Sequence, residues 1–182
     1  MNRILLCLFV LCAWGFAGPL AKRKLVADKS RSTVTYAAKH PLHKWEGVSH
    51  DVNCAMIYND DTKTPESVAV SIKVASFDSQ NNNRDSHAIE VLEGLKYPNV
   101  TFVSSGIKTN EDGTLSARGN LTFHGVAKPV SVQVTRKEAG GKMTLTGEFP
   151  VSLTEYNVER PSLMGFKTDD LMTLRFDLVF PL

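Results

Sequence analysis

The sequence predicts an all-β fold: an eight-stranded antiparallel barrel interrupted by one short helix. Apolar and polar side chains alternate along most of the chain, which is the period-2 pattern of strands with one buried face. Short turns rich in Gly, Asn, Asp and Pro separate the alternating segments, so consecutive strands are expected to pair antiparallel. Eight such strands suit a closed barrel, and a two-sheet sandwich is the competing architecture.

The predicted strands follow one another between recognisable turns. Residues 22–28 are expected to form a polar lead-in, and His40-Pro41 to end the first strand. Asn110–Gly113 is expected to be a hairpin turn, because Asp-Gly tolerates the positive φ angles that such turns need. The strands are expected at residues 33–38, 51–58, 68–74, 100–104, 115–123, 129–134, 143–149 and 172–180.

A helical insert is expected near residues 84–95. Asn82 or Asn83 is the expected cap, because a short side-chain oxygen accepts hydrogen bonds from the first turn, and Gly94 and Pro98 are expected to stop the helix. Four apolar residues at three- and four-residue spacing would give it one apolar face: Ala88, Ile89, Leu92 and Leu95. We expect this helix to lie as a lid beside whatever cavity the strands enclose.

Composition describes one ordinary globular domain. The chain has 182 residues, 42% of them hydrophobic and 22% charged, with a formal net charge of +2. It contains no run of lysine and arginine longer than Lys22-Arg23-Lys24, so composition offers no argument for nucleic acid or for an anionic membrane surface as a partner. Stable membrane insertion is not expected either.

The N-terminus predicts export to the periplasm or beyond the cell. Asn2 and Arg3 precede an apolar stretch from Ile4 to Phe16, and Ala17 fits the last residue of a cleaved signal peptide. The expected organisation is therefore a signal peptide over 1–17 and a barrel domain over 18–182. Thirteen apolar residues fall short of the roughly 20 that a membrane-spanning helix needs.

Cysteine usage fits the same picture. Cys7 and Cys12 lie inside the predicted signal peptide, so the mature chain keeps only Cys54 and forms no internal disulfide. Cys54 alternates with Val52 and Met56, which indicates a small buried hydrophobic side chain instead of a reactive thiol.

Candidate polar site residues gather in the helical insert. Arg84, Asp85 and His87 admit three interpretations: acid–base catalysis, a purely structural role, or hydrogen bonding to the polar end of an apolar ligand. We favour the third, with helix capping as a further role for Asp85. No GxSxG, HExxH or P-loop motif is present, so no catalytic residues are assigned. No metal site or cofactor is predicted, because the histidines lack the usual zinc-ligand spacing: His40, His43, His50, His87 and His124.

Apolar side chains that share one phase of the strands are either plain core or the lining of a lumen able to take a long hydrocarbon. These side chains are Val70, Ile72, Phe102, Leu121, Phe123, Val132, Val134 and Phe149.

Three motifs carry a resemblance to a known family. NNNRDSHAIEVLEGLKYPNVTFVSS, GNLTFHGVAKPVSV and DKSRSTVTYAAKHPLHKWEGV, in an order that covers most of residues 25–180, resemble the signature of the YceI-like, polyisoprenoid-binding family. The resemblance implies an exported lipocalin-like barrel whose hydrophobic lumen holds a long isoprenoid chain. The positions that match the family pattern are His40, Arg84, Asp85, His87, Tyr97, Pro98, Phe102, Leu121, His124 and Gly125.

Two segments depart from that pattern. Val91-Leu92 stands where many members carry an aromatic pair, and NVERPSLMGFKTDD replaces the commoner form of a later loop.

The resulting prediction is a non-enzymatic protein that binds an isoprenoid or another long-chain lipid for transport, storage or sequestration. Its expected ligand-binding residues are His40, Arg84, Asp85, His87, Phe102, Leu121, Phe123, Val132 and Phe149. The alternatives are a small hydrolase or isomerase using Asp85 and His87, and a structural barrel filled by its own side chains. A homodimer is possible through strand edges or a helix face.

Overall fold

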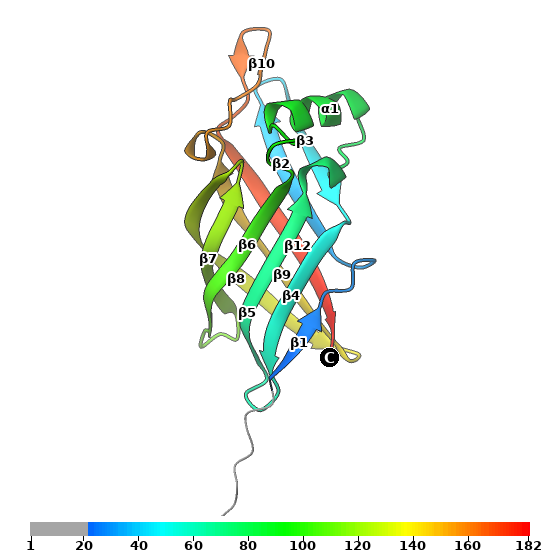
Figure 1. Ribbon diagram of the computed structural model, residues 1–182, viewed down its shortest axis with the longest axis vertical. Coiled ribbons are helices and arrows are strands. Elements are labelled where there is room, and N and C mark those ends of the chain that lie inside the picture. The colour runs from blue at the N-terminus through cyan, green and yellow to red at the C-terminus, as the bar shows by residue number, and fades with distance from the viewer. Residues whose placement is uncertain (1–21) are drawn as a thin grey trace, which may run out of the picture.

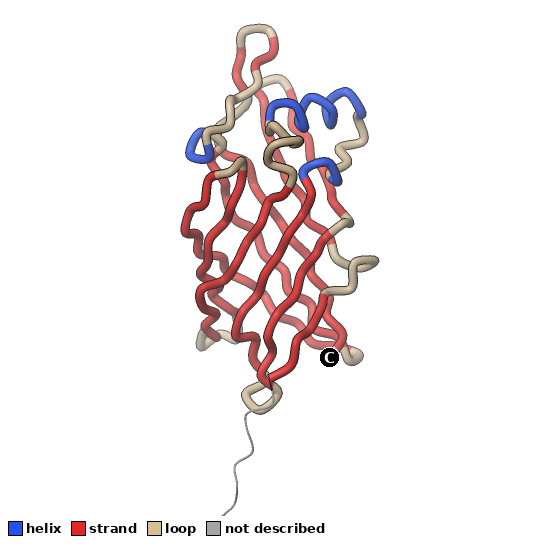
Figure 2. Tube along the Cα trace, in the orientation of Figure 1, coloured by secondary structure: helices blue, strands red, loops and turns tan. Residues whose placement is uncertain are grey.

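A computed structural model describes residues 22–182 and shows one antiparallel sheet of ten strands curled into a half-barrel (Figures 1 and 2). The strand order is β1-β4-β5-β6-β7-β8-β9-β12-β2-β3, and β10 and β11 form a separate two-stranded hairpin. The predicted signal peptide over 1–17 lies outside the described residues. The elements are β1 (Lys22–Val26), β2 (Thr33–His40), β3 (His43–Ser49), β4 (Val52–Asn59), β5 (Thr64–Lys73), η1 (Val74–Ser76), α1 (Asn82–Val91), β6 (Asn99–Thr109), β7 (Leu115–Phe123), β8 (Val126–Ala139), β9 (Lys142–Ser152), η2 (Thr154–Tyr156), β10 (Ser162–Leu163), β11 (Phe166–Lys167) and β12 (Leu171–Pro181).

The all-β prediction with one helix is confirmed, but the prediction of eight strands is wrong. β1 has the sequence KRKLV and buries only Leu25. Because its other side chains are mostly basic, we predicted a polar lead-in where the structure has an edge strand. β3 escaped notice because Pro41-Leu42 does not end the sheet: it forms a two-residue turn that pairs His40 with His43.

The two ends of the sheet are tied to neighbouring segments. Val48 of β3 exchanges two backbone hydrogen bonds of 2.9 Å with Asp78, in the loop before α1. At the opposite end of the barrel, Asp28 N–H donates to the Val179 carbonyl of β12 at 2.7 Å. These contacts hold the curled sheet in shape where its outer strands β1 and β3 do not pair with each other.

The helix is shorter and earlier than predicted, spanning Asn82–Val91. Asn81 is the N-cap, and its side chain accepts from Arg84 N–H at 3.0 Å; neither Asn82 nor Asn83 does this. No residue of α1 is fully buried, and Leu95, which was expected on the apolar face, is 99% exposed. The helix ends before Leu95, so helical periodicity no longer governs where that side chain points.

The end of α1 is a Schellman motif. Gly94 N–H donates to Ile89 O at 2.8 Å, and Glu93 N–H donates to Glu90 O at 3.0 Å. Glu93 takes the left-handed position with φ 45°, which glycine usually occupies. The chain therefore places a charged side chain where the backbone alone would favour glycine.

Two groups of buried side chains form the core. The larger fills the end of the barrel near β1 and includes Met56, Leu115, Met143 and Phe180, and Cys54 packs there at 3% exposure. The prediction that Cys54 is a buried small hydrophobic residue is confirmed. The second group lies toward the helix end and consists of Leu121, Phe123, Val151, Leu153, Tyr156 and Val158.

Candidate ligand cavity

Helix α1 lies across one end of the half-barrel (Figure 1). A cavity of about 570 Å³ lies at that end, lined in part by residues of α1. Its wall combines apolar side chains of the strands, such as Phe123 and Met172, with polar side chains of α1 and of the β2–β3 hairpin. We call it the upper chamber.

A smaller cavity of about 100 Å³ adjoins the upper chamber inside the barrel, and we call it the lower chamber. The two chambers share Val34, Ile72, Val100 and Leu174 in their walls. Apart from Thr101 and Arg175, only apolar residues line the lower chamber. The arrangement is an apolar recess with a polar mouth.

All nine predicted ligand-binding residues lie in the walls of these chambers. The upper chamber is lined by His40, Arg84, Asp85, His87 and Phe123. The lower chamber is lined by Phe102, Leu121, Val132 and Phe149.

Arg84 and Asp85 are both bound to Ser79, in the loop before α1. Arg84 Nε donates to Ser79 Oγ and Arg84 Nη2 to the Ser79 carbonyl, each at 2.8 Å. The Asp85 carboxylate accepts from Ser79 N–H and from Ser79 Oγ–H. Asp85 therefore anchors the loop to the helix, and the capping role that we predicted for it belongs to Asn81.

The two predicted histidines of the mouth differ in environment. His87 is 61% exposed and lies 3.5 Å from Glu90, one turn along the helix. His40 is 3% exposed; its Nε2–H donates to the Phe166 carbonyl at 2.9 Å, and its Nδ1 accepts from Leu42 N–H at 3.2 Å. His40 is thus a structural link between the β2–β3 turn and β11.

Aromatic residues that the sequence did not single out contribute much of the upper wall. Tyr36 and Phe77 meet edge to face with centroids 5.4 Å apart, and the Arg84 guanidinium lies 5.8 Å from the Trp45 ring. Burial raises the pKa of Tyr36, so its phenol stays neutral inside the chamber. Tyr36 stood on a recognised strand face, but nothing in the sequence distinguished it from other core positions.

The segment 157–170 also contributes to the mouth, through Val158, Pro161, Ser162, Leu163 and Thr168. This is the segment that departs from the family pattern. Val91 and Leu92, the other departure, line the same chamber.

A contact through the largely buried His124 joins the segment after α1 to the β7–β8 turn. His124 Nδ1–H donates to the Tyr156 carbonyl at 3.1 Å, and His124 Nε2 lies 3.0 Å from Glu93 Oε2 without an aligned hydrogen bond. The Tyr97 ring packs edge-on against His124, with centroids 4.9 Å apart. Tyr97 and His124, which both match the family pattern, therefore fasten the segment after α1 to the barrel. Neither residue lines the chambers.

The His124-Gly125 pair forms the turn itself. Both residues have positive φ, 48° and 73°, as a two-residue type I′ hairpin requires. His tolerates this conformation better than most residues, and Gly125 leaves room for the Tyr97 ring.

Within residues 22–182, no three His, Cys, Asp or Glu side chains gather as a metal site would require. No helix in that range is long and apolar enough to cross a membrane.

The comparison with known sequences decides the family. A model of the YceI-like domain matches residues 25–180, nearly all of the described chain. The chain belongs to the YceI-like family. The resemblance read from its motifs is thereby confirmed.

Individual relatives share limited sequence identity with this chain. The UPF0312 protein of Pseudomonas putida is 39% identical over 79 residues, and the match spans 41% of each chain, less than half of that relative's length. Protein YceI of Salmonella newport is 27% identical over 147 residues, 76% of each chain.

Solved structures share the fold. BcnA of Burkholderia cenocepacia superposes with a TM-score of 0.75 at 25% identity, covering 84% of this chain and 98% of BcnA. A polyisoprenoid binding domain from Saccharophagus degradans, implicated in plant cell wall breakdown, superposes with a TM-score of 0.66 over 90% of this chain and 99% of that domain. Its 11% identity establishes likeness of fold alone.

Proposed function

We propose that this protein binds a long apolar lipid of the isoprenoid type inside the half-barrel and carries or sequesters it without chemical change. The observation that supports the proposal is the pair of adjoining chambers, which share four apolar wall residues. A chain-like ligand fits such a space, because the upper chamber adjoins a smaller one lined almost wholly by apolar groups. The shared fold with a domain described as polyisoprenoid binding supports the same ligand class.

Burial of the ligand's apolar surface supplies the affinity, at roughly 25 cal/mol for each Å² removed from water. The polar end of the ligand stays at the mouth, near Arg84 and His87. Arg84 uses Nε and Nη2 on Ser79, and its Nη1 donates to no protein group that the described chain provides. That nitrogen is the donor we assign to a ligand oxygen.

Export to the periplasm or outside the cell belongs to the same proposal and is supported by the signal-peptide pattern of residues 1–17. The homodimer likewise stays a prediction. Catalysis by Asp85 and His87 is not proposed, because Asp85 is bound to Ser79 and His87 faces Glu90.

Native mass spectrometry tests the proposal. The mature protein, purified and then incubated with quinones and polyprenols, is expected to gain the mass of one ligand molecule. Ala88→Trp fills the upper chamber from α1 and is expected to abolish that gain. Ser86→Trp puts the same side chain on an exposed position of the same helix and should leave binding intact.

A clean apo mass with every quinone and polyprenol would overturn the proposal. Equal binding by the Ala88→Trp and Ser86→Trp proteins would also overturn the proposal, because a tryptophan at position 88 occupies the space that a ligand in the upper chamber needs.

A further inference from the structure

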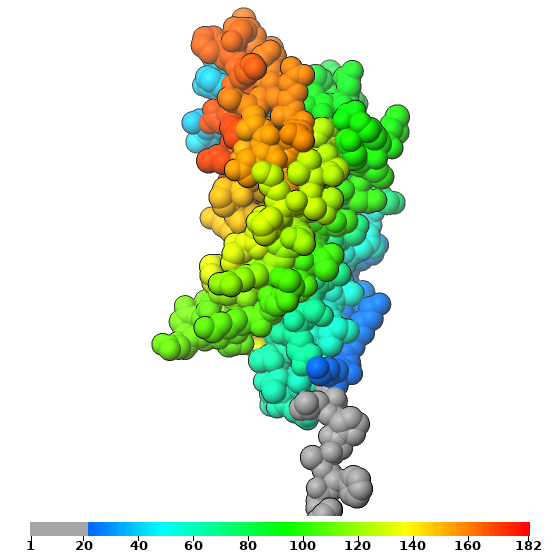
Figure 3. Space-filling model, turned by 60° about the vertical axis from the view of Figure 1, so that its left-hand side comes forward, coloured from blue at the N-terminus to red at the C-terminus, as the bar shows by residue number. Residues whose placement is uncertain are grey.

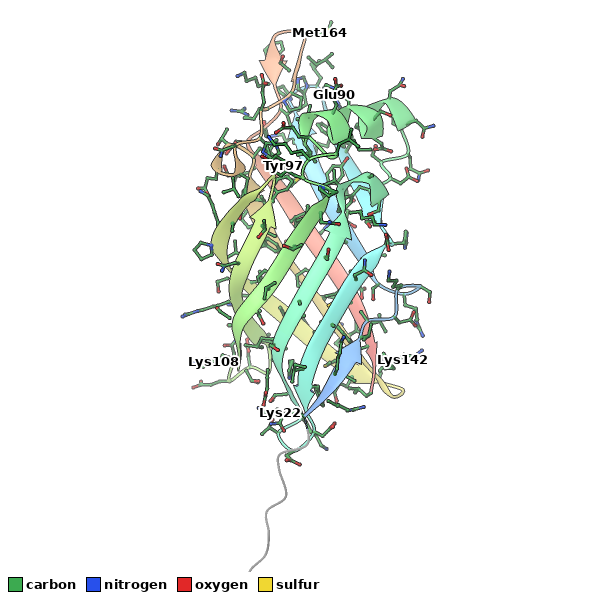
Figure 4. All side chains as sticks on the ribbon, in the orientation of Figure 1. Lys22, Glu90, Tyr97, Lys108, Lys142 and Met164 are labelled. Carbon is green, nitrogen blue, oxygen red and sulfur yellow. The ribbon has the colours of Figure 1, made fainter. Side chains whose placement is uncertain are left out.

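Four large apolar side chains are exposed at one end of the molecule, beside the mouth of the upper chamber. Leu42 occupies the β2–β3 turn, and Leu163, Met164 and Phe166 belong to the β10–β11 hairpin; their exposed fractions are 58%, 51%, 80% and 55%. Figure 4 shows Met164 at the extreme end of the molecule, opposite Lys22 and Lys142. We call these four residues the tip.

The two turns that carry the tip are fastened together. His40 Nε2–H donates to the Phe166 carbonyl, and Asp169 N–H donates to the Lys39 carbonyl at 2.8 Å. Lys39 Nζ also lies 3.3 Å from the Asp169 carboxylate. Figure 3 shows the two segments next to each other at that end. The tip residues therefore lie on two segments that are joined by two hydrogen bonds and one ion pair.

Met164 occupies a backbone position that does not suit it. Met164 and Gly165 have φ of 53° and 83°, the two positive values of a type I′ hairpin, and Asn-Gly is the favoured pair there. Methionine in this conformation costs free energy that asparagine would largely avoid. An exposed methionine at this position is best explained by what its side chain contacts outside the chain.

Basic side chains lie beside the tip residues in the sequence. Lys39, Lys44 and Lys167 are exposed on the same two hairpins. Lys39 pairs with Asp169, and Glu46, which is also exposed on β3, pairs with Arg175 of β12. Trp45 of β3 follows the β2–β3 turn and lines the upper chamber. Tryptophan is enriched at the interface between membrane and water. The whole-chain charge of +2 conceals this local arrangement.

We propose that the tip docks the protein reversibly on the surface of a lipid bilayer that contains anionic lipids. Apolar side chains on a narrow projection suit insertion between headgroups, and the lysines match the negative surface. Leu163 belongs both to the tip and to the wall of the upper chamber, so docking would set the chamber mouth against the membrane. The proposed function concerns the lipid that is bound, whereas docking through the tip identifies the membrane surface from which that lipid would enter.

Vesicle flotation tests the proposal. The mature protein starting at Gly18 is used, so that the apolar stretch 4–16 cannot cause binding. It is mixed with vesicles of phosphatidylcholine alone or of phosphatidylcholine with phosphatidylglycerol, both free of isoprenoid. Binding is expected to the anionic vesicles and to weaken as salt is added.

The decisive variant is Leu42→Asn with Met164→Asn, because asparagine suits both turns and removes both apolar side chains. We expect vesicle binding to fall roughly tenfold or more for each side chain withdrawn from lipid. The matched control is Val103→Thr, which changes a side chain that is 55% exposed on the barrel wall; it should bind as the parent does.

Absence of binding to both vesicle types, or equal binding by the double variant, would overturn the proposal. Equal binding to neutral and anionic vesicles would overturn its electrostatic part. If the double variant instead turned a dimer into a monomer in sedimentation, with vesicle binding unchanged, the tip would be a self-association surface. Because the vesicles hold no isoprenoid, docking and cargo binding can fail separately.

Discussion

Two histidines that match the family motifs, His87 and His124, have very different surroundings in this protein. His124 has 10% of its side chain exposed and bridges Tyr156 and Glu93, whereas His87 is 61% exposed on the helix surface. Both match the family pattern, but only His87 was predicted to bind the ligand. The structure shows that His124 joins the segment after α1 to Tyr156, whereas His87 lies exposed at the mouth of the upper chamber.

Replacing His124 with Asn is expected to reduce the free energy of unfolding by about 1–3 kcal/mol, because the Tyr156 carbonyl loses the hydrogen bond from the largely buried His124 ring. Asn tolerates the positive φ of this turn, so the backbone is preserved. Urea unfolding measures the change. His87→Asn is the control and should stay within about 0.5 kcal/mol of the parent; a similar loss in both variants would contradict the assignment.

Cys54 gives a prediction about pH. Burial raises the pKa of its thiol to about 12, whereas an unfolded cysteine ionises near pH 8.5. The folded state therefore holds its proton where the unfolded state releases it, and stability should fall as pH rises from about 8.5 toward 12. The native thiol should also resist thiol reagents until the protein unfolds.

Comparing the pH dependence of unfolding between the parent protein and Cys54→Ala isolates this contribution. The variant should lose less stability between neutral and alkaline pH. Identical slopes in the two proteins, or rapid labelling of the native thiol, would show that the thiol is not buried as the structure has it.

Among the elements, strands β6 and β7 pack closely because the Phe102 ring of β6 lies against Gly119 of β7. A Cβ built at Gly119 of β7 would lie 2.3 Å from the Val103 carbonyl oxygen and 2.7 Å from the Phe102 ring. Phe102 lines the lower chamber, so Gly119 sets both the spacing of two strands and the position of one cavity wall.

Gly119→Ala is therefore expected to destabilise the protein by about 1–3 kcal/mol, the usual cost of overpacking against a rigid neighbour. Gly106→Ala provides the matched comparison on β6, since nothing lies within 4 Å of its added Cβ. The second variant should be neutral or slightly stabilised, because alanine restricts the unfolded chain. Thermal unfolding of the pair measures the difference, and equal melting temperatures would contradict this account of the sheet.

Considered as a whole molecule, the half-barrel divides into a packed end and a hollow end. Large buried side chains such as Phe180 and Met143 fill the end near β1, while the chambers occupy the centre and the helix end. Stability from the core and space for a ligand are thus separated along the barrel axis. The lid contacts and the tip both lie at the hollow end.

A ligand that occupies the chambers must stabilise the folded state. At a free concentration of 100 times the dissociation constant the gain is about 2.7 kcal/mol, which raises the melting temperature of a domain of this size by roughly 5–10 °C. Delipidated protein titrated with a quinone or polyprenol in a thermal-shift measurement should show this rise. Ala88→Trp should show none, and a rise in that variant would place the ligand elsewhere.

Much of the fold was determined by local sequence patterns. The period-2 alternation led to an antiparallel all-β fold, and the helical spacing after Asn81 led to a single helix, because both patterns repeat over a few neighbouring residues. The same phase relation picked out wall residues of the lower chamber such as Phe102 and Leu121. Family motifs located the mouth.

Tertiary structure alone decided the rest. β1 and β3 became visible only through their partners β4 and β2, since an edge strand can expose both faces and lose the alternating pattern. The commitment of Arg84 and Asp85 to Ser79, and of His40 to Phe166, depends on contacts that no local pattern encodes. Residues 126 positions apart in the sequence meet at that last contact, because closure of the sheet and docking of the hairpin bring them together.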